Sequence, residues 1–268
     1  MSVGTSGPRI AFVHGLFGQG RNWMQIAKAL SGPQADQARC LLVDLPDHGR
    51  SPWGDHFSLQ AYAAAVASTL RTTAPAEPWT LVGHSLGGKV AMLVALSQPD
   101  LLDRLAVIDI APRHYRSHHW FVDYVHALRS LPLQTLPDRA SADAALAPQI
   151  PEPAIRAFLL QNLRRHGSEW SWQVNFDALV RAGLGQTGVA GWPGADATAY
   201  RPFGKPVVWV GGADSTYIGE RDEEPMRALF PRVRQVMVKG AGHWVHSDQP
   251  EVVTEILRRF ALSPTRRA

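Results

Sequence analysis

The residues best suited to chemistry in this sequence surround Ser85. It lies in the run GHSLG at 83–87, after the apolar run 79–82 and before the helix-like stretch 89–96. Glycines on both sides allow a sharp turn from strand to helix that exposes the serine hydroxyl. The first N–H groups of the following helix favour negative charge at that point. The pattern predicts that Ser85 is the nucleophile of an acyl transfer.

A serine nucleophile needs a base, and the base needs an acid that orients it. Asp214 ends the segment GGAD at 211–214, which follows an apolar run at 207–210, and His243 follows a second run at 233–238. We expect His243 to be the general base and Asp214 the acid. His246 is a weaker candidate for the base, and we expect it to pack or hydrogen-bond locally.

A negatively charged oxygen in the transition state needs N–H donors, and two places in the chain offer them. One donor is the amide of Leu86, the residue after the nucleophile. The other comes from the loop HGLFG at 14–18, where we expect the Leu16 amide, with Phe17 as the alternative. The Phe17 ring is an expected wall of the substrate pocket, and His14 is expected to be structural.

These loops need a scaffold that brings them together. Short apolar or β-branched runs alternate with longer helix-like stretches, at 10–13, 40–43, 79–82, 105–110, 207–210 and 233–238. Strands that alternate with helices indicate an α/β fold with a parallel sheet. In such sheets the ligand site lies beyond the carboxyl ends of the strands, so the loops should converge there.

The alternation stops in the middle of the chain. Between residues 113 and 200, helix-like pieces occur instead, at 120–131, 154–165 and 172–182. We therefore expect an inserted helical cap at 113–200 and a discontinuous catalytic core made of 1–112 and 201–268.

Composition excludes several classes of protein. The 268 residues carry a formal charge of +4 with no concentrated basic stripe, so no nucleic-acid partner is expected. Cys40 is the only cysteine, which excludes an intramolecular disulfide and a cysteine-based zinc site. We find no secretory pattern and no apolar run long enough for a membrane span, so we expect a cytoplasmic protein. No cofactor and no metal are expected, and the oligomeric state is left open.

Five motifs together resemble the α/β-hydrolase superfamily, and more narrowly the small YbfF-like bacterial esterases and their mitochondrial relatives. They are HGLFG (14–18), DLPDHGRS (44–51), GHSLGGKVAM (83–92), IDIAP (108–112) and GHWVH (242–246). The resemblance implies a mostly parallel central sheet flanked by helices. Only nine residues precede the first core strand, so the usual N-terminal hairpin is expected to be missing or rudimentary.

The resemblance also offers a second acid. In the YbfF-like group the position of Asp214 commonly lacks an aspartate, and a carboxylate in the IDIAP segment, here Asp109, can serve the histidine. We prefer Asp214 and keep Asp109 as the alternative, with Ser215 as a possible hydrogen-bond partner in the same cluster.

The expected function is a serine hydrolase that cleaves ester or thioester bonds of small acyl substrates through an acyl-enzyme. A serine nucleophile argues against dehalogenases and epoxide hydrolases of similar fold, which use aspartate. A lyase, a C–C bond hydrolase and a non-catalytic binding protein are the alternatives. Basic residues begin the cap, either as a solvated face or as an entrance for anionic acyl carriers such as coenzyme A thioesters: Arg113, His114, Arg116, His118 and His119.

Overall fold

The computed structural model describes residues 1–32, 37–115, 119–183, 189, 191–192 and 200–262. Within these ranges seven strands form one sheet in the order β1-β3-β2-β4-β5-β8-β9. Their bounds are β1 Ser2–Val3, β2 Arg9–Val13, β3 Arg39–Val43, β4 Trp79–His84, β5 Leu102–Ile108, β8 Val207–Gly212 and β9 Val233–Val238. All neighbouring pairs are parallel except β1 with β3, so the expected α/β architecture is confirmed.

The sheet is buried on both faces, and its central strands are mostly apolar. In β2, Ile10 and Phe12 belong to one buried cluster, and Ala11 and Val13 belong to the other. This is the period of two that a strand imposes on its side chains. The Ile10 side packs against α1 (Met24–Ser31) and α10 (Pro250–Leu262), and the opposite side packs against α2 (Leu59–Thr73) and α3 (Leu86–Ser97).

The remaining core elements are short. A 3₁₀ helix, η1 (Gly20–Trp23), leads into α1, and η2 (Pro99–Leu101) leads into β5. Beyond β8 come η4 (Glu220–Asp222) and α8 (Glu223–Leu229), and α9 (Val245–Asp248) precedes α10.

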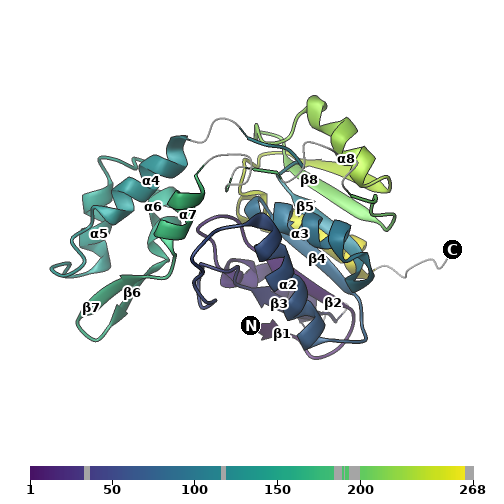
Figure 1. Cartoon of the computed structure of the whole chain (residues 1–268), viewed down its shortest axis with the longest axis horizontal. Coiled ribbons are helices and arrows are strands. Elements are labelled where there is room, and N and C mark those ends of the chain that lie inside the picture. The colour runs from purple at the N-terminus through teal and green to yellow at the C-terminus, as the bar shows by residue number, and fades with distance from the viewer. Residues whose placement is uncertain (33–36, 116–118, 184–188, 190, 193–199, 263–268) are drawn as a thin grey trace.

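The segment between β5 and β8 forms the lobe beside the sheet in Figure 1. It contains α4 His119–Arg129, α5 Arg139–Leu146, α6 Pro153–Leu160, α7 Phe176–Ala182 and the antiparallel pair β6 Leu163–His166 and β7 Glu169–Trp172. The expected helices are therefore shorter than their sequence patterns, and the lobe is not purely helical. The division of the chain at residues 113 and 200 stays a prediction.

The N-terminal part of the sheet is reduced, as expected. One two-residue strand, β1, precedes β2 in the described chain and pairs antiparallel with β3 through Ser2 and Leu41. None of the helices in the described ranges combines the length and the hydrophobicity that crossing a bilayer requires.

Candidate active site

Ser85 lies at the sharp turn between β4 and α3. Its backbone has φ 53° and ψ −119°, a strained conformation that costs about 1–3 kcal/mol and occurs mainly at functional sites. The turn brings α3 against the end of β2, where an added Cβ on Gly87 would stand 2.4 Å from the His14 carbonyl oxygen. The strand-to-helix context predicted for Ser85 is therefore confirmed.

A chain of hydrogen bonds runs from Ser85 through His243 to a buried carboxylate. The Ser85 hydroxyl lies 3.0 Å from His243 Nε2, and His243 Nδ1 lies 2.7 Å from Asp109 Oδ2. With Nδ1 protonated, the imidazole donates to the carboxylate and offers Nε2 as an acceptor to the serine. This is the geometry that a general base requires.

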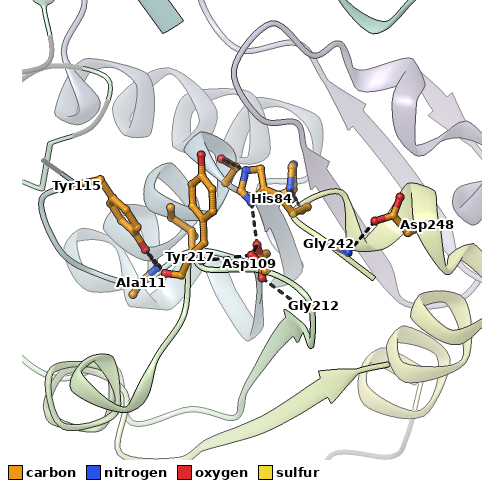
Figure 2. A network of polar contacts seen from close by, with 12 residues as sticks. His84, Asp109, Ala111, Tyr115, Gly212, Tyr217, Gly242 and Asp248 are labelled. Carbon is orange, nitrogen blue, oxygen red and sulfur yellow. Dashed lines mark hydrogen bonds and ion pairs between the residues drawn. The ribbon is translucent and has the colours of Figure 1, made fainter. Parts of the chain in front are cut away.

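Asp109 is held at the carboxyl end of β5 by the sheet itself. Its own N–H donates to the Val210 carbonyl, and its backbone adopts a positive φ of 50°. The carboxylate is fully buried and accepts hydrogen bonds from the Gly212 N–H and the Ser215 hydroxyl. Figure 2 shows Asp109 and Gly212 joined in this way. The expected participation of Ser215 is confirmed.

The prediction that Asp214 orients His243 is wrong. The Asp214 side chain is exposed, and its backbone N–H donates to the Ala241 carbonyl. The turn closed by Ser215 N–H and the Gly212 carbonyl presents the Ser215 hydroxyl, not the Asp214 carboxylate, to the interior. The alternative acid, Asp109, is the one that contacts His243.

The loop after β2 lies directly against Ser85. An added Cβ on Gly15 would stand 3.2 Å from Ser85 Cβ, and the Gly18 N–H donates to the Gly15 carbonyl to close a tight turn. Phe17 occupies its third position with φ 60°, the positive value that a type II turn needs there. Leu86 is the first residue of α3, where N–H groups have no intrahelical acceptor. The donor roles of Leu16 and Leu86 stay predictions.

Two further histidines, His84 and His246, lie beside the site in neutral form. His84 Nε2 donates to the His243 carbonyl (2.8 Å), which fixes the backbone of His243. Burial, together with neighbouring histidines, lowers the pKa of His84 well below its ordinary value and that of His246 to about 3. His246 stacks on Trp23 with ring centroids 4.4 Å apart, so its expected packing role is confirmed. The role of His84 was not predicted from the sequence.

A cavity of about 180 Å³ opens onto Ser85 and His243. Phe17 lines it, as expected, and its ring stacks on Phe121 of α4. Four more lining residues come from α4 and α6 and were not singled out in the sequence: Tyr124, Ile155, Phe158 and Leu159. The i, i+3, i+4 spacing of the last three is the apolar stripe that could have revealed them.

The basic start of the cap is only partly described. Arg113 forms an ion pair with Asp222 (2.7 Å) and lies 3.7 Å over the Tyr115 ring. Arg116 and His118 lie outside the described residues, and the His119 side chain is not described. The two interpretations of this segment, a solvated face and an entrance for anionic acyl carriers, stay predictions.

Comparisons with known proteins support the fold described above. A family model described as "alpha/beta hydrolase fold" matches residues 8–250. The mouse (Mus musculus) protein "sn-1-specific diacylglycerol lipase ABHD11" is 34% identical over 94% of this chain and 80% of its own length. "Esterase YbfF" of Escherichia coli (strain K12) is 30% identical over 94% of this chain and 92% of its own length.

Solved structures extend the comparison to three dimensions. A structure titled "Marine microorganism esterase" superposes with a TM-score of 0.89 at 29% identity, covering 97% of both chains. The family match spans the sheet from β2 to β9, the Ser85 turn and the His243 loop. The chain therefore belongs to the α/β-hydrolase fold family.

Proposed function

We propose that this protein hydrolyses carboxylic ester or thioester bonds of small acyl substrates through an acyl-enzyme. The observation that carries the proposal is the hydrogen-bonded chain from Ser85 through His243 to Asp109. The esterase and lipase names of the relatives support the same reaction class. The volume of the cavity, about 180 Å³, supports a small acyl group. For comparison, an apolar protein cavity of about 150 Å³ holds one benzene molecule.

In the first step, His243 Nε2 accepts the Ser85 proton as Ser85 Oγ attacks the carbonyl carbon. The Leu16 and Leu86 amides stabilise the oxyanion of the tetrahedral intermediate, where one such donor lowers the barrier by about 3–4 kcal/mol. His243 then donates the proton to the departing alcohol or thiol. Asp109 keeps the imidazole in the required tautomer and balances its charge.

In the second step, a water molecule takes the place of the leaving group. His243 removes one proton from this water, and the hydroxide attacks the acyl carbon of the Ser85 ester. The intermediate collapses, Ser85 regains its proton from His243, and the carboxylic acid leaves. No cofactor enters either step.

The direct test uses the variant Ser85→Ala with p-nitrophenyl esters of two to eight acyl carbons. We expect kcat to fall at least about 10⁴-fold, because a nucleophile acts as a unit with its base. A fluorophosphonate probe should label the wild type at Ser85. The matched control is Ser97→Ala, at the far end of α3, where the hydroxyl donates to the Leu93 carbonyl of the same helix.

Three outcomes separate the proposal from its alternatives. Full activity in Ser85→Ala would overturn the mechanism. An inert Ser85 in the wild type, with no ester turnover, would favour a binding protein on this scaffold. Probe labelling without ester or thioester turnover would favour a lyase or a C–C bond hydrolase.

A further inference from the structure

An aromatic ring lies flat against the imidazole of the catalytic base. Tyr217, in the loop between β8 and η4, stacks on His243 with ring centroids 3.7 Å apart and an interplanar angle of 18°. Nothing in the sequence patterns singled out this residue. The contact covers one face of His243 and leaves its two nitrogens to Ser85 and Asp109.

Tyr217 is fixed by hydrogen bonds at both ends of its backbone. Its carbonyl accepts from the Tyr115 hydroxyl (2.8 Å), which in turn accepts from the Ala111 N–H (2.8 Å). Figure 2 shows this pair of contacts. The Tyr217 N–H donates to Ser215 Oγ, and Ser215 also bonds Asp109. The loop between β8 and η4 therefore holds both the Asp109 carboxylate and the Tyr217 ring in place.

The other titratable groups that face His243 define its charge environment. Asp109 supplies a buried carboxylate at Nδ1. The His84 ring lies 4.8 Å away on the side of β4, and His246 follows in α9. Burial lowers the pKa of both histidines, so they stay neutral when the base becomes charged. The face of an aromatic ring carries negative charge density and attracts a cation stacked on it.

We infer that Tyr217 is a positioning residue that stabilises the charged form of His243. The inference rests on the proposed function. When the Ser85 proton moves to Nε2, a positive charge appears on the imidazole, over the face of the Tyr217 ring. When the proton passes to the leaving group, that charge disappears. The stack thus stabilises the charged imidazole, which forms in both steps of the reaction. It also keeps the imidazole in plane with Ser85 and Asp109.

The test replaces the ring with Tyr217→Leu and measures the pH profile of kcat/KM with p-nitrophenyl butyrate. Loss of the ring should lower kcat about tenfold. It should also move the acid limb of the profile to lower pH by about 0.5–1 unit, because the imidazolium is less stabilised. The conservative variant Tyr217→Phe keeps the aromatic face and should rescue both values.

The comparison variant is Phe158→Leu, which shortens an aromatic side chain of the cavity outside the stack. It should change KM and leave the acid limb in place. An acid limb at the wild-type pH in a folded Tyr217→Leu variant would overturn the inference. If that variant does not fold by circular dichroism, Tyr217→Trp takes its place: a larger ring should hold or raise the acid limb, and a shift to lower pH overturns the inference.

A second measurement keeps this inference separate from the proposed function. The imidazole of His243 can be followed by NMR without substrate, its signal identified by its loss in His243→Asn. Its titration midpoint should be lower in Tyr217→Leu than in Tyr217→Phe. Equal midpoints contradict the role of Tyr217 even if the esterase activity is established, and a difference supports it even if the substrate class is another.

Discussion

Three donors converge on the Asp109 carboxylate: the His243 imidazole, the Ser215 hydroxyl and the Gly212 N–H. A fully buried carboxylate is costly unless it is hydrogen-bonded in this way, so the arrangement selects one rigid position for the acid. Asp214, four residues after Val210, is exposed instead. At the scale of single residues, burial therefore decides which aspartate can orient the base.

Changing Asp109 or Asp214 to asparagine should affect kcat very differently. Asp109→Asn should lower kcat by about 10³–10⁴-fold, because the amide no longer holds the imidazole in the tautomer that accepts the serine proton. Asp214→Asn should change kcat less than about twofold, as expected for an exposed side chain. The measurement is steady-state hydrolysis of p-nitrophenyl butyrate at pH 8. A larger loss of kcat in Asp214→Asn would mean that Asp214 takes part in the reaction.

At the scale of elements, the site depends on how closely α3 can approach β2. The strained turn at Ser85 persists because β5 and the first turn of α3 hold it: the Ser85 N–H donates to the Ile108 carbonyl, and the Gly88 N–H donates to the Ser85 carbonyl. The start of the helix then rests on the end of β2, where Gly87 faces main-chain carbonyls of Val13 and His14.

Gly87→Ala should therefore damage both stability and activity. Its Cβ would stand 2.4–2.6 Å from two backbone oxygens, which cannot swing aside as a flexible side chain could. We expect the free energy of unfolding to fall by about 1–3 kcal/mol, as for overpacked sites, together with a clear loss of kcat. Urea unfolding measures the first effect. Gly204→Ala is the matched control, because an added Cβ there meets nothing within 4 Å and stability should stay within about 0.5 kcal/mol.

The elements that sequence reasoning located are those with a strong local signal. The strands of the main sheet are rich in apolar residues and the Ser85 turn has a glycine on each side, so both could be placed from neighbouring residues alone. The acid could not, since Asp109 and Asp214 both follow strands that end at the same edge of the sheet. Their difference arises from a turn between Gly212 and Ser215 and from tertiary burial. The β6–β7 pair was missed because each strand is only four residues long, although Trp170 and Trp172 alternate with polar residues in β7.

At the scale of the whole molecule, the inserted segment is bonded to the loops that carry the site. Asn162, between α6 and β6, donates to the Phe17 carbonyl (2.7 Å) and accepts from the Gln19 amide. Asn175, at the start of α7, donates to the buried Asp47 carboxylate (2.8 Å). Lys89 of α3 reaches the Gly191 carbonyl across the same boundary. The core and the segment between β5 and β8 thus together determine the shape of the cavity and the position of the loop at 14–18.

A buried histidine, His14, makes the stability of the protein depend on pH. His14 donates from Nδ1 to the Gly15 carbonyl and accepts the Leu45 N–H at Nε2, so it joins the loops after β2 and β3 only while neutral. Burial, aided by repulsion from His48, lowers its pKa from 6.5 to about 3 in the folded protein. The unfolded chain binds the proton more readily, so stability falls as pH drops below 6.5 and continues to fall toward 3.

At pH 5 this single histidine should cost about 2 kcal/mol of stability relative to pH 8. His14→Asn removes the titration while its amide keeps a donor and an acceptor at the same place. The variant should be less stable than the wild type at pH 8, yet its free energy of unfolding should fall less between pH 8 and pH 5, by about 2 kcal/mol. Urea unfolding at both pH values measures the difference. An identical drop in both proteins would mean that His14 titrates alike in the folded and unfolded chains, and that protonation does not break the link between its two loops.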